Sequence, residues 1–202
     1  VLKSKDANVD LRRIDFVGPQ IGEELREDGG LGMLTALIIV MIYVAIRFQL
    51  KFSIGAVLAL AHDVIITLGL FSLGRLEFDL TVLAAILAVV GYSLNDTIVV
   101  SDRIRENFRK KRRSETIPLI DRSLNQMLGR TLITSLTTLL VLFALLIFGG
   151  DAIQNFSTAL IIGVMVGTYS SIYIVCNTLI SLNITADDLA VRKSERFDDG
   201  MP

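Results

Sequence analysis

Two carboxylates lie in the middle of long apolar runs of the sequence. Asp63, preceded by His62, interrupts residues 52–74, and Asp96 interrupts residues 80–101. On insertion scales a charged side chain at the centre of a bilayer costs about 3 kcal/mol, so it is a candidate for function. Because burial favours the neutral form of a carboxyl group, residues in such places are suited to loading and releasing protons.

Polar side chains lie beside Asp96, at Ser93 and Asn95. At the start of a later apolar run, a cation and two hydroxyl residues are spaced four apart: Arg130, Thr134 and Thr138. Residues four apart share one face of a helix. If that face meets Asp96, a proton on the carboxyl would break its pairing with Arg130 and let the two helices rearrange. The alternative is a static buried ion pair that fixes the register of the helices.

Asp63 lies on a face of small residues. The positions four apart along this run are Gly55, Ala59, Asp63 and Thr67. Small faces let membrane helices approach closely. We therefore expect Asp63 to be packed between helices and bonded to a neighbouring hydroxyl or backbone group, in a supporting role or as a direct proton relay. His62 is expected on another side of the helix, as a packing or interface residue.

A second stripe of small residues lies in the last apolar run. Its members, again four apart, are Ala159, Gly163, Gly167 and Ser171. This spacing predicts close helix packing, either within the chain or against another subunit.

Other chemistry is poorly supported by the sequence. The two aspartates raise the possibility of an intramembrane aspartyl protease, but Ser93, Leu94 and Asn95 stand where a Gly-x-Gly motif would precede Asp96. The sequence has one cysteine, Cys176, and one histidine, which are too few for a zinc site made of such ligands. The net charge of −1 gives no indication of nucleic-acid binding. We expect no enzymatic activity, no cofactor and no metal.

The elements that position these residues are membrane-spanning helices. The chain has 202 residues, 52% of them hydrophobic, and a mean hydropathy of +0.60. A span needs about 20 apolar residues, and five segments qualify: 29–48, 52–74, 79–101, 130–149 and 155–182. The sequence thus predicts an all-α polytopic membrane protein, with an amphipathic helix at 115–128 along the cytoplasmic face.

The ends of the chain are polar. Residues 1–28 suggest a short strand through Phe16 and Val17, a turn, and a helical stretch near residues 21–27. We interpret them as the end of an external α+β domain in a longer protein, and residues 187–202 as a cytoplasmic tail. Lys and Arg are concentrated between residues 103 and 130, after the first span and in the tail. The positive-inside rule therefore places the C-terminus in the cytoplasm and the N-terminal segment outside.

Several blocks of the sequence resemble one known family. The run GYSLNDTIVVSDRIRENFRK at 91–110 is similar to the signature of the SecF family, membrane subunits of bacterial SecDF protein-export complexes within the resistance-nodulation-division (RND) superfamily. Further blocks in the right order are VGPQIGEEL (17–25), ALAHDVIITLG (59–69), GRTLITSLTTL (129–139) and FGG (148–150).

The resemblance implies spans two to six of a six-span protein, whose external domain is periplasmic. It implies a proton-driven subunit of the Sec protein translocase in the bacterial inner membrane, with SecD, the SecYEG translocon, unfolded preproteins and membrane lipids as partners. In this family the matching residues make Asp96 and Arg130 part of the proton path. The alternatives are an RND-type exporter of small molecules or lipids, and a passive scaffold that stabilises the translocon.

Overall fold

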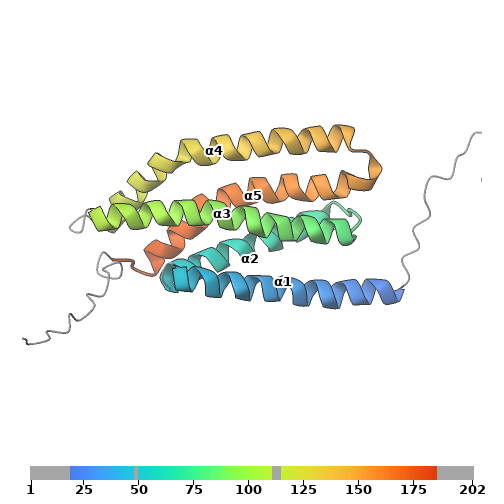
Figure 1. The fold of residues 1–202 in the computed structure, drawn as a ribbon, viewed down its shortest axis with the longest axis horizontal. Coiled ribbons are helices and arrows are strands. Elements are labelled where there is room, and N and C mark those ends of the chain that lie inside the picture. The colour runs from blue at the N-terminus through green and yellow to red at the C-terminus, as the bar shows by residue number, and fades with distance from the viewer. Residues whose placement is uncertain (1–18, 48–49, 111–114, 186–202) are drawn as a thin grey trace, which may run out of the picture.

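The computed structural model describes residues 19–47, 50–110 and 115–185, which form five helices (Figure 1). These are α1 (Pro19–Arg47), α2 (Leu50–Leu73), α3 (Leu80–Lys110), α4 (Thr116–Phe148) and α5 (Asp151–Ser181). Each helix is long and apolar enough to cross a membrane, which confirms the five predicted spans. The strand expected at residues 16–17 and the tail at 187–202 lie outside the described residues.

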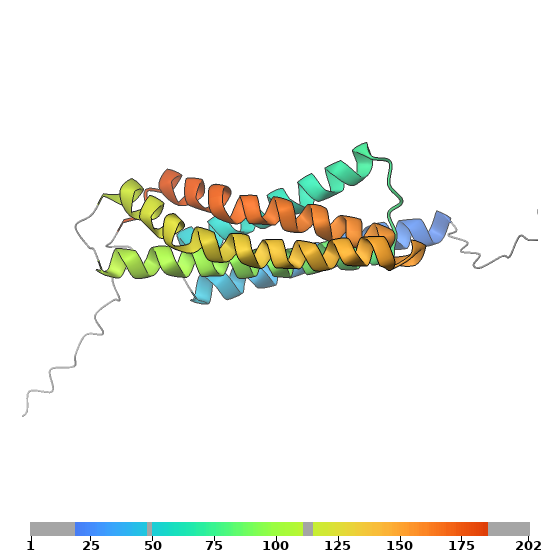
Figure 2. The same ribbon diagram turned by 90° about the horizontal axis from the view of Figure 1, so that it is seen from above.

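Helix α5 is the centre of the bundle. It packs against α2, α3 and α4, whereas α1 packs mainly on α2. Figures 1 and 2 show the helices running lengthwise along the molecule, with α2 inclined to the others, and Figure 1 shows α1 and α4 on opposite outer sides. The buried polar residues therefore lie mainly where α2, α3 and α5 meet.

The two larger apolar clusters of the bundle interior lie one toward each end. The cluster near the end of α3 includes Phe52, Ile104 and Phe108, and the other includes Phe71 and Val82. A smaller third cluster, Leu142, Ile161 and Val164, joins α4 to α5. The middle of α3, at Ser93 and Asp96, lies between the two larger clusters. Hydroxyls and carboxylates thus form a polar layer between two apolar ones.

The amphipathic helix expected at 115–128 is not a separate element, because these residues form the first turns of α4. Pro118 lies in the first turn, where a missing N–H is tolerated, and Gly129 weakens a helix by about 1 kcal/mol without ending it. Leu119 and Ile120 are buried in the cluster with Phe108, so these turns pack on the bundle. Figure 1 shows them sloping away from the rest of α4.

Helices α3 and α4 are also longer than the predicted spans. With 31 and 33 residues, they are about 46 and 50 Å long at about 1.5 Å per residue, against a hydrocarbon core of about 30 Å. The basic end of α3 at Lys110 and the beginning of α4 therefore extend past the hydrocarbon region together.

The start of α3 and the turn between α4 and α5 are each determined by a few local residues. Asp79 caps α3: its Oδ1 accepts hydrogen bonds from the Thr81 hydroxyl at 2.6 Å and the Val82 N–H at 2.9 Å. Partial burial raises the pKa of Asp79, but these bonds outweigh burial and hold the pKa below its ordinary value. Between α4 and α5, Gly150 has a φ of 75°, and a Cβ on Gly149 would clash with the Leu145 carbonyl oxygen. Glycine is required at both positions.

Candidate functional site

Asp63 is the hub of a buried polar cluster that joins three helices. Its carboxyl group is fully inaccessible to solvent in α2. Ser93 of α3 donates its hydroxyl to Oδ2 at 2.5 Å, and Ser170 of α5 donates to the same oxygen at 2.8 Å. Buried polar groups need such partners, because an unsatisfied one costs about 1–3 kcal/mol. The contact with neighbouring hydroxyls that the sequence predicts for Asp63 is present.

The small-residue stripes bring these helices together. A Cβ on Gly167 would lie 3.2 Å from the Ser93 Cβ and 3.5 Å from Asp63 Oδ2, and one on Gly163 would clash with the Val89 side chain. On α2, a Cβ on Gly55 would be 3.7 Å from the Val175 carbonyl oxygen of α5. Ala59, Ala159 and Ser171 are fully buried as well. The packing of both stripes therefore lies within this chain.

His62 contacts the hub, although the two residues lie on different sides of α2 as the sequence predicts. Its Nδ1 lies 3.2 Å from Asp63 Oδ1, and its side chain is 30% exposed. A flexible imidazole can reach back toward the next residue of its own helix, which a count of helical positions does not reveal. Polar groups thus run from the surface of α2, through His62, to the buried carboxylate.

Asp96 is buried without the partners that Asp63 has. It lies on α3, one turn beyond Ser93, and is 5% exposed. Neither its Oδ2 nor the hydroxyl of the adjacent Thr97 has a hydrogen-bond partner among the described residues. Asn95 faces outward. The two buried aspartates are therefore different kinds of site: one satisfied by hydroxyl donors, the other open to a further ligand or proton.

Arg130 does not pair directly with Asp96 in this conformation. The side chain of Arg130 is exposed, and no hydrogen bond or ion pair joins the two residues within the described part of the chain. Arg130 lines a cavity of about 410 Å³ with Asp102, Arg103 and Tyr43. The same cavity is lined by Ile98 and Val99, which lie within one turn of Asp96 on α3.

The predicted hydroxyl track on α4 faces away from the bundle. Thr134 is exposed and Thr138 half-buried, and their hydroxyls donate to the carbonyl oxygens of Arg130 and Thr134. The hydroxyls that face inward are those of Thr131 and Ser135, which the sequence analysis missed. The four-residue spacing correctly predicts that Thr134 and Thr138 share one face of the helix. Thr131 and Ser135 have the same spacing and share the adjacent face, so spacing alone does not show which face points inward.

Ser135 belongs to a second polar contact between helices. It lies 2.7 Å from the Thr168 hydroxyl of α5, and Tyr92 of α3 donates to it at 3.4 Å. Tyr92 precedes Asp96 by four residues, so this contact and Asp96 lie along the same side of α3. The α3–α4–α5 interface around Asp96 is therefore held by neutral hydroxyls and not by an ion pair.

The comparisons with known proteins assign the family. A family model described as "Protein export membrane protein SecD/SecF, C-terminal" matches residues 1–185. The chain belongs to the SecD/SecF family. It is 54% identical, over its whole length, to the protein translocase subunit SecF of Pseudomonas aeruginosa, and 47% identical over 96% of its length to that of Escherichia coli O157:H7.

Solved SecDF structures share the arrangement of the helices. The crystal structure of SecDF from Thermus thermophilus, described as a translocon-associated membrane protein, has a TM-score of 0.78 and 49% identity over 83% of this chain and 23% of its own. SecDF in the super-membrane-facing form has a TM-score of 0.75. The chain spans about two thirds of the length of the SecF relatives, 66% and 60% of the two named above.

Proposed function

We propose that this SecD/SecF-family chain acts in the Sec protein translocase of the bacterial inner membrane, where with SecD it uses the proton motive force to promote preprotein export. The names of its relatives support the translocase role. SecD, the SecYEG translocon and the unfolded preprotein are the proposed partners. The N-terminal segment is proposed to be periplasmic and the C-terminus cytoplasmic, from the distribution of Lys and Arg.

The observation that carries the proton coupling is the contrast between the two buried aspartates. The Asp63 carboxyl accepts two hydroxyl donors, so taking up a proton on Oδ2 would disturb bonds to α3 and α5. The Asp96 carboxyl has an oxygen with no such bond, and it lies within one turn of Ile98 and Val99, which line a cavity together with Arg130. It can gain a proton without loss of a hydrogen bond.

Arg130 would respond to that proton. With Asp96 ionised, the exposed guanidinium is attracted toward α3, and with Asp96 neutral it is released to the cavity that it shares with Asp102. Because Arg130 is carried by α4 and Asp96 by α3, the protonation state biases how these two helices sit together. Asp63, His62 and Ser93 would support this by fixing α3 to α2 and α5.

The test is export driven by the proton motive force in cells that carry the full-length protein with Asp96→Asn. Asparagine keeps the size and hydrogen-bonding capacity of the side chain but cannot exchange a proton. We expect loss of the proton-dependent part of export, with normal insertion and normal assembly with SecD. Asp121→Asn, at an exposed position on α4, is the matched control and should leave export unchanged.

Unchanged export in the Asp96→Asn variant would contradict the proposal and favour a passive scaffold. If the Asp96→Asn variant failed to assemble with SecD, its loss of export would not report on proton coupling. For that case Arg130→Lys, at an exposed position, is the second variant: it keeps the charge but changes its geometry, and should reduce export while assembly persists.

A further inference from the structure

A basic pocket lies between the end of α3 and the beginning of α4, away from Asp63 and Asp96. Its volume is about 410 Å³. Arg103, Asn107 and Lys110 of α3 and Leu119, Arg122 and Gln126 of α4 line it. Three of these residues are cationic, and no described residue that lines the pocket is acidic.

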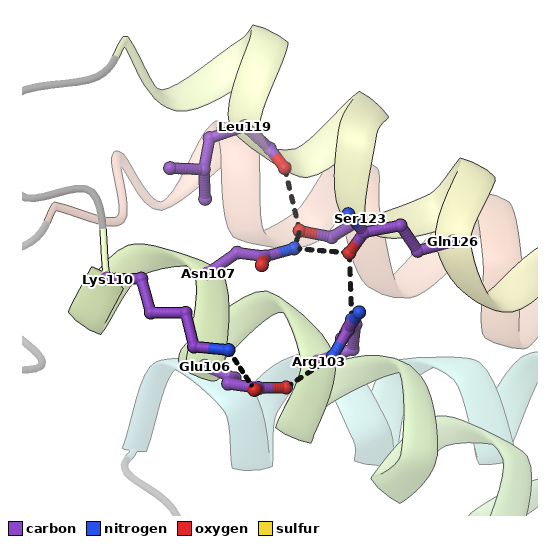
Figure 3. A network of polar contacts seen from close by, with 7 residues as sticks. All are labelled: Arg103, Glu106, Asn107, Lys110, Leu119, Ser123 and Gln126. Carbon is purple, nitrogen blue, oxygen red and sulfur yellow. Dashed lines mark hydrogen bonds and ion pairs between the residues drawn. The ribbon is translucent and has the colours of Figure 1, made fainter.

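One carboxylate near the pocket is already shared by two of its cations. Glu106 binds Arg103 through Nη1 at 2.6 Å and Lys110 through Nζ at 2.6 Å, as Figure 3 shows. Arg122 is exposed and has no hydrogen bond or ion pair within the described part of the chain. The positive charges of the pocket therefore outnumber the negative charges that neutralise them.

Two of the cations, Arg103 and Lys110, are held in place by a polar network (Figure 3). Arg103 Nε donates to Gln126 Oε1 at 2.8 Å, and Asn107 Nδ2 donates to the same oxygen at 3.0 Å and to Ser123 Oγ at 2.8 Å. These bonds join α3 to α4 and fix the Arg103 guanidinium at the pocket wall. A preorganised guanidinium suits a phosphate, because its donors match phosphate oxygens.

The position of the pocket along the helices indicates where its ligand comes from. The parts of α3 and α4 that line it are the ends that extend past the apolar spans, on the side richest in Lys and Arg. Apolar side chains of α4 are exposed beside the pocket and further along the helix, at Ile117 and Leu128. A phosphate here would lie at the level of lipid headgroups, with apolar surface available to acyl chains.

We propose that this pocket binds the phosphate of an anionic phospholipid from the cytoplasmic leaflet. Basic pockets between membrane helices on that side favour anionic headgroups. Bound there, the lipid would bridge Arg103 and Lys110 on α3 to Arg122 on α4. It would thereby brace the two helices that also carry Asp96 and Arg130.

The test measures lipid retained by the full-length protein, purified with its membrane partner from nanodiscs of phosphatidylcholine containing a minor share of phosphatidylglycerol. Phosphatidylglycerol bound after transfer to detergent is counted by mass spectrometry. We expect enrichment of phosphatidylglycerol, and a loss of about five-fold in Arg122→Gln, the factor expected for one cation near an anionic surface. Arg109→Gln is the matched control, since Arg109 lies in the last turn of α3, beside Lys110, but does not line the pocket.

Each outcome decides the proposal. Equal losses in Arg122→Gln and Arg109→Gln would overturn it, because they would indicate a general positive belt and no defined pocket. Absence of enrichment over phosphatidylcholine would also overturn it. If inorganic phosphate displaced the lipid completely and bound with the same dependence on Arg122, the pocket would be a site for soluble anions, and the lipid source would be wrong.

Discussion

Two adjacent serine hydroxyls near Asp63 differ in whether they bond to another helix. Ser170 and Ser171 are neighbours on α5 and both are fully buried. Ser170 reaches Asp63 on α2, whereas Ser171 donates only to the Thr168 carbonyl of its own helix, at 3.1 Å. Their removal should therefore affect the protein differently, although the two substitutions are chemically identical.

We predict that Ser170→Ala lowers the free energy of unfolding by about 1–3 kcal/mol, because a buried carboxylate loses one donor. Ser171→Ala removes a bond within one helix and should change stability by clearly less. The measurement is the thermal unfolding midpoint of the purified full-length protein in detergent. Equal shifts in the two variants would show that the bond to Asp63 contributes nothing particular.

The sequence predicted the candidate site only in part. Asp63 and Asp96 stand out because a carboxylate in an apolar run is rare. The partner Ser170 does not stand out, since serines are common in packed membrane helices. Contacts between helices depend on their rotation and relative height, which the order of residues along one helix does not specify. For the same reason the four-residue spacing predicts Thr134 and not the inward-facing Ser135.

At the scale of a helix, α5 lies close to α3 at Gly163. A methyl group there would clash with the Val89 side chain, which is itself buried. Val89 has one stiff torsion and little room to move. The helices could accept the methyl group only by separating.

We predict that Gly163→Ala destabilises the bundle by about 1–3 kcal/mol through overpacking. Gly91→Ala is the matched control: a Cβ on Gly91 meets nothing within 4 Å, and alanine favours a helix over glycine by up to about 1 kcal/mol. Thermal unfolding of both variants is the measurement. A neutral or stabilising effect of Gly163→Ala would contradict the close packing of α5 on α3.

The beginning of α3 gives a prediction for pH. The pKa of Asp79 is lower in the folded protein than in the unfolded chain, so its cap stabilises above the unfolded pKa of about 3.9 and is lost as pH falls through the folded pKa. Asp79→Ala should cost about 1 kcal/mol at neutral pH and nothing in strong acid. The unfolding midpoint measured against pH checks this, with Glu77→Ala as control. A cost that persisted in acid would argue against the cap.

The helices themselves were easier to predict than their ends. Hydropathy located all five spans, because the bilayer requires length and apolarity and little else. It did not locate the beginning of α4, where the turns from Thr116 onward are amphipathic and continue into the span without a break. Whether such turns join a span or lie on the membrane depends on packing, here of Leu119 and Ile120 against the bundle.

At the scale of the molecule, five spans place the beginning of α1 and the end of α5 on opposite sides of the membrane. The loop at Glu77 and the turn before Asp151 then share one side, and Lys110 and Glu115 lie on the other. The distribution of Lys and Arg predicts that the second side is cytoplasmic.

We predict that a membrane-impermeant maleimide labels Asp151→Cys in spheroplasts but not Glu115→Cys, both in a Cys176→Ser background. Cys176 is buried and is the only native cysteine. The reagent cannot cross the bilayer, so only a cysteine on the outer side reacts in sealed cells. Lysed cells, in which both positions should react, are the control. The reverse pattern would invert the proposed topology.

The turn at Gly149 and Gly150 has a consequence for biogenesis. Only these two residues separate α4 from α5, so the pair leaves the ribosome as one continuous hydrophobic hairpin. Asp151 is the single charge near its tip. Since nearly nothing hydrophilic has to be carried across, we expect the two helices to enter the bilayer in a single integration event.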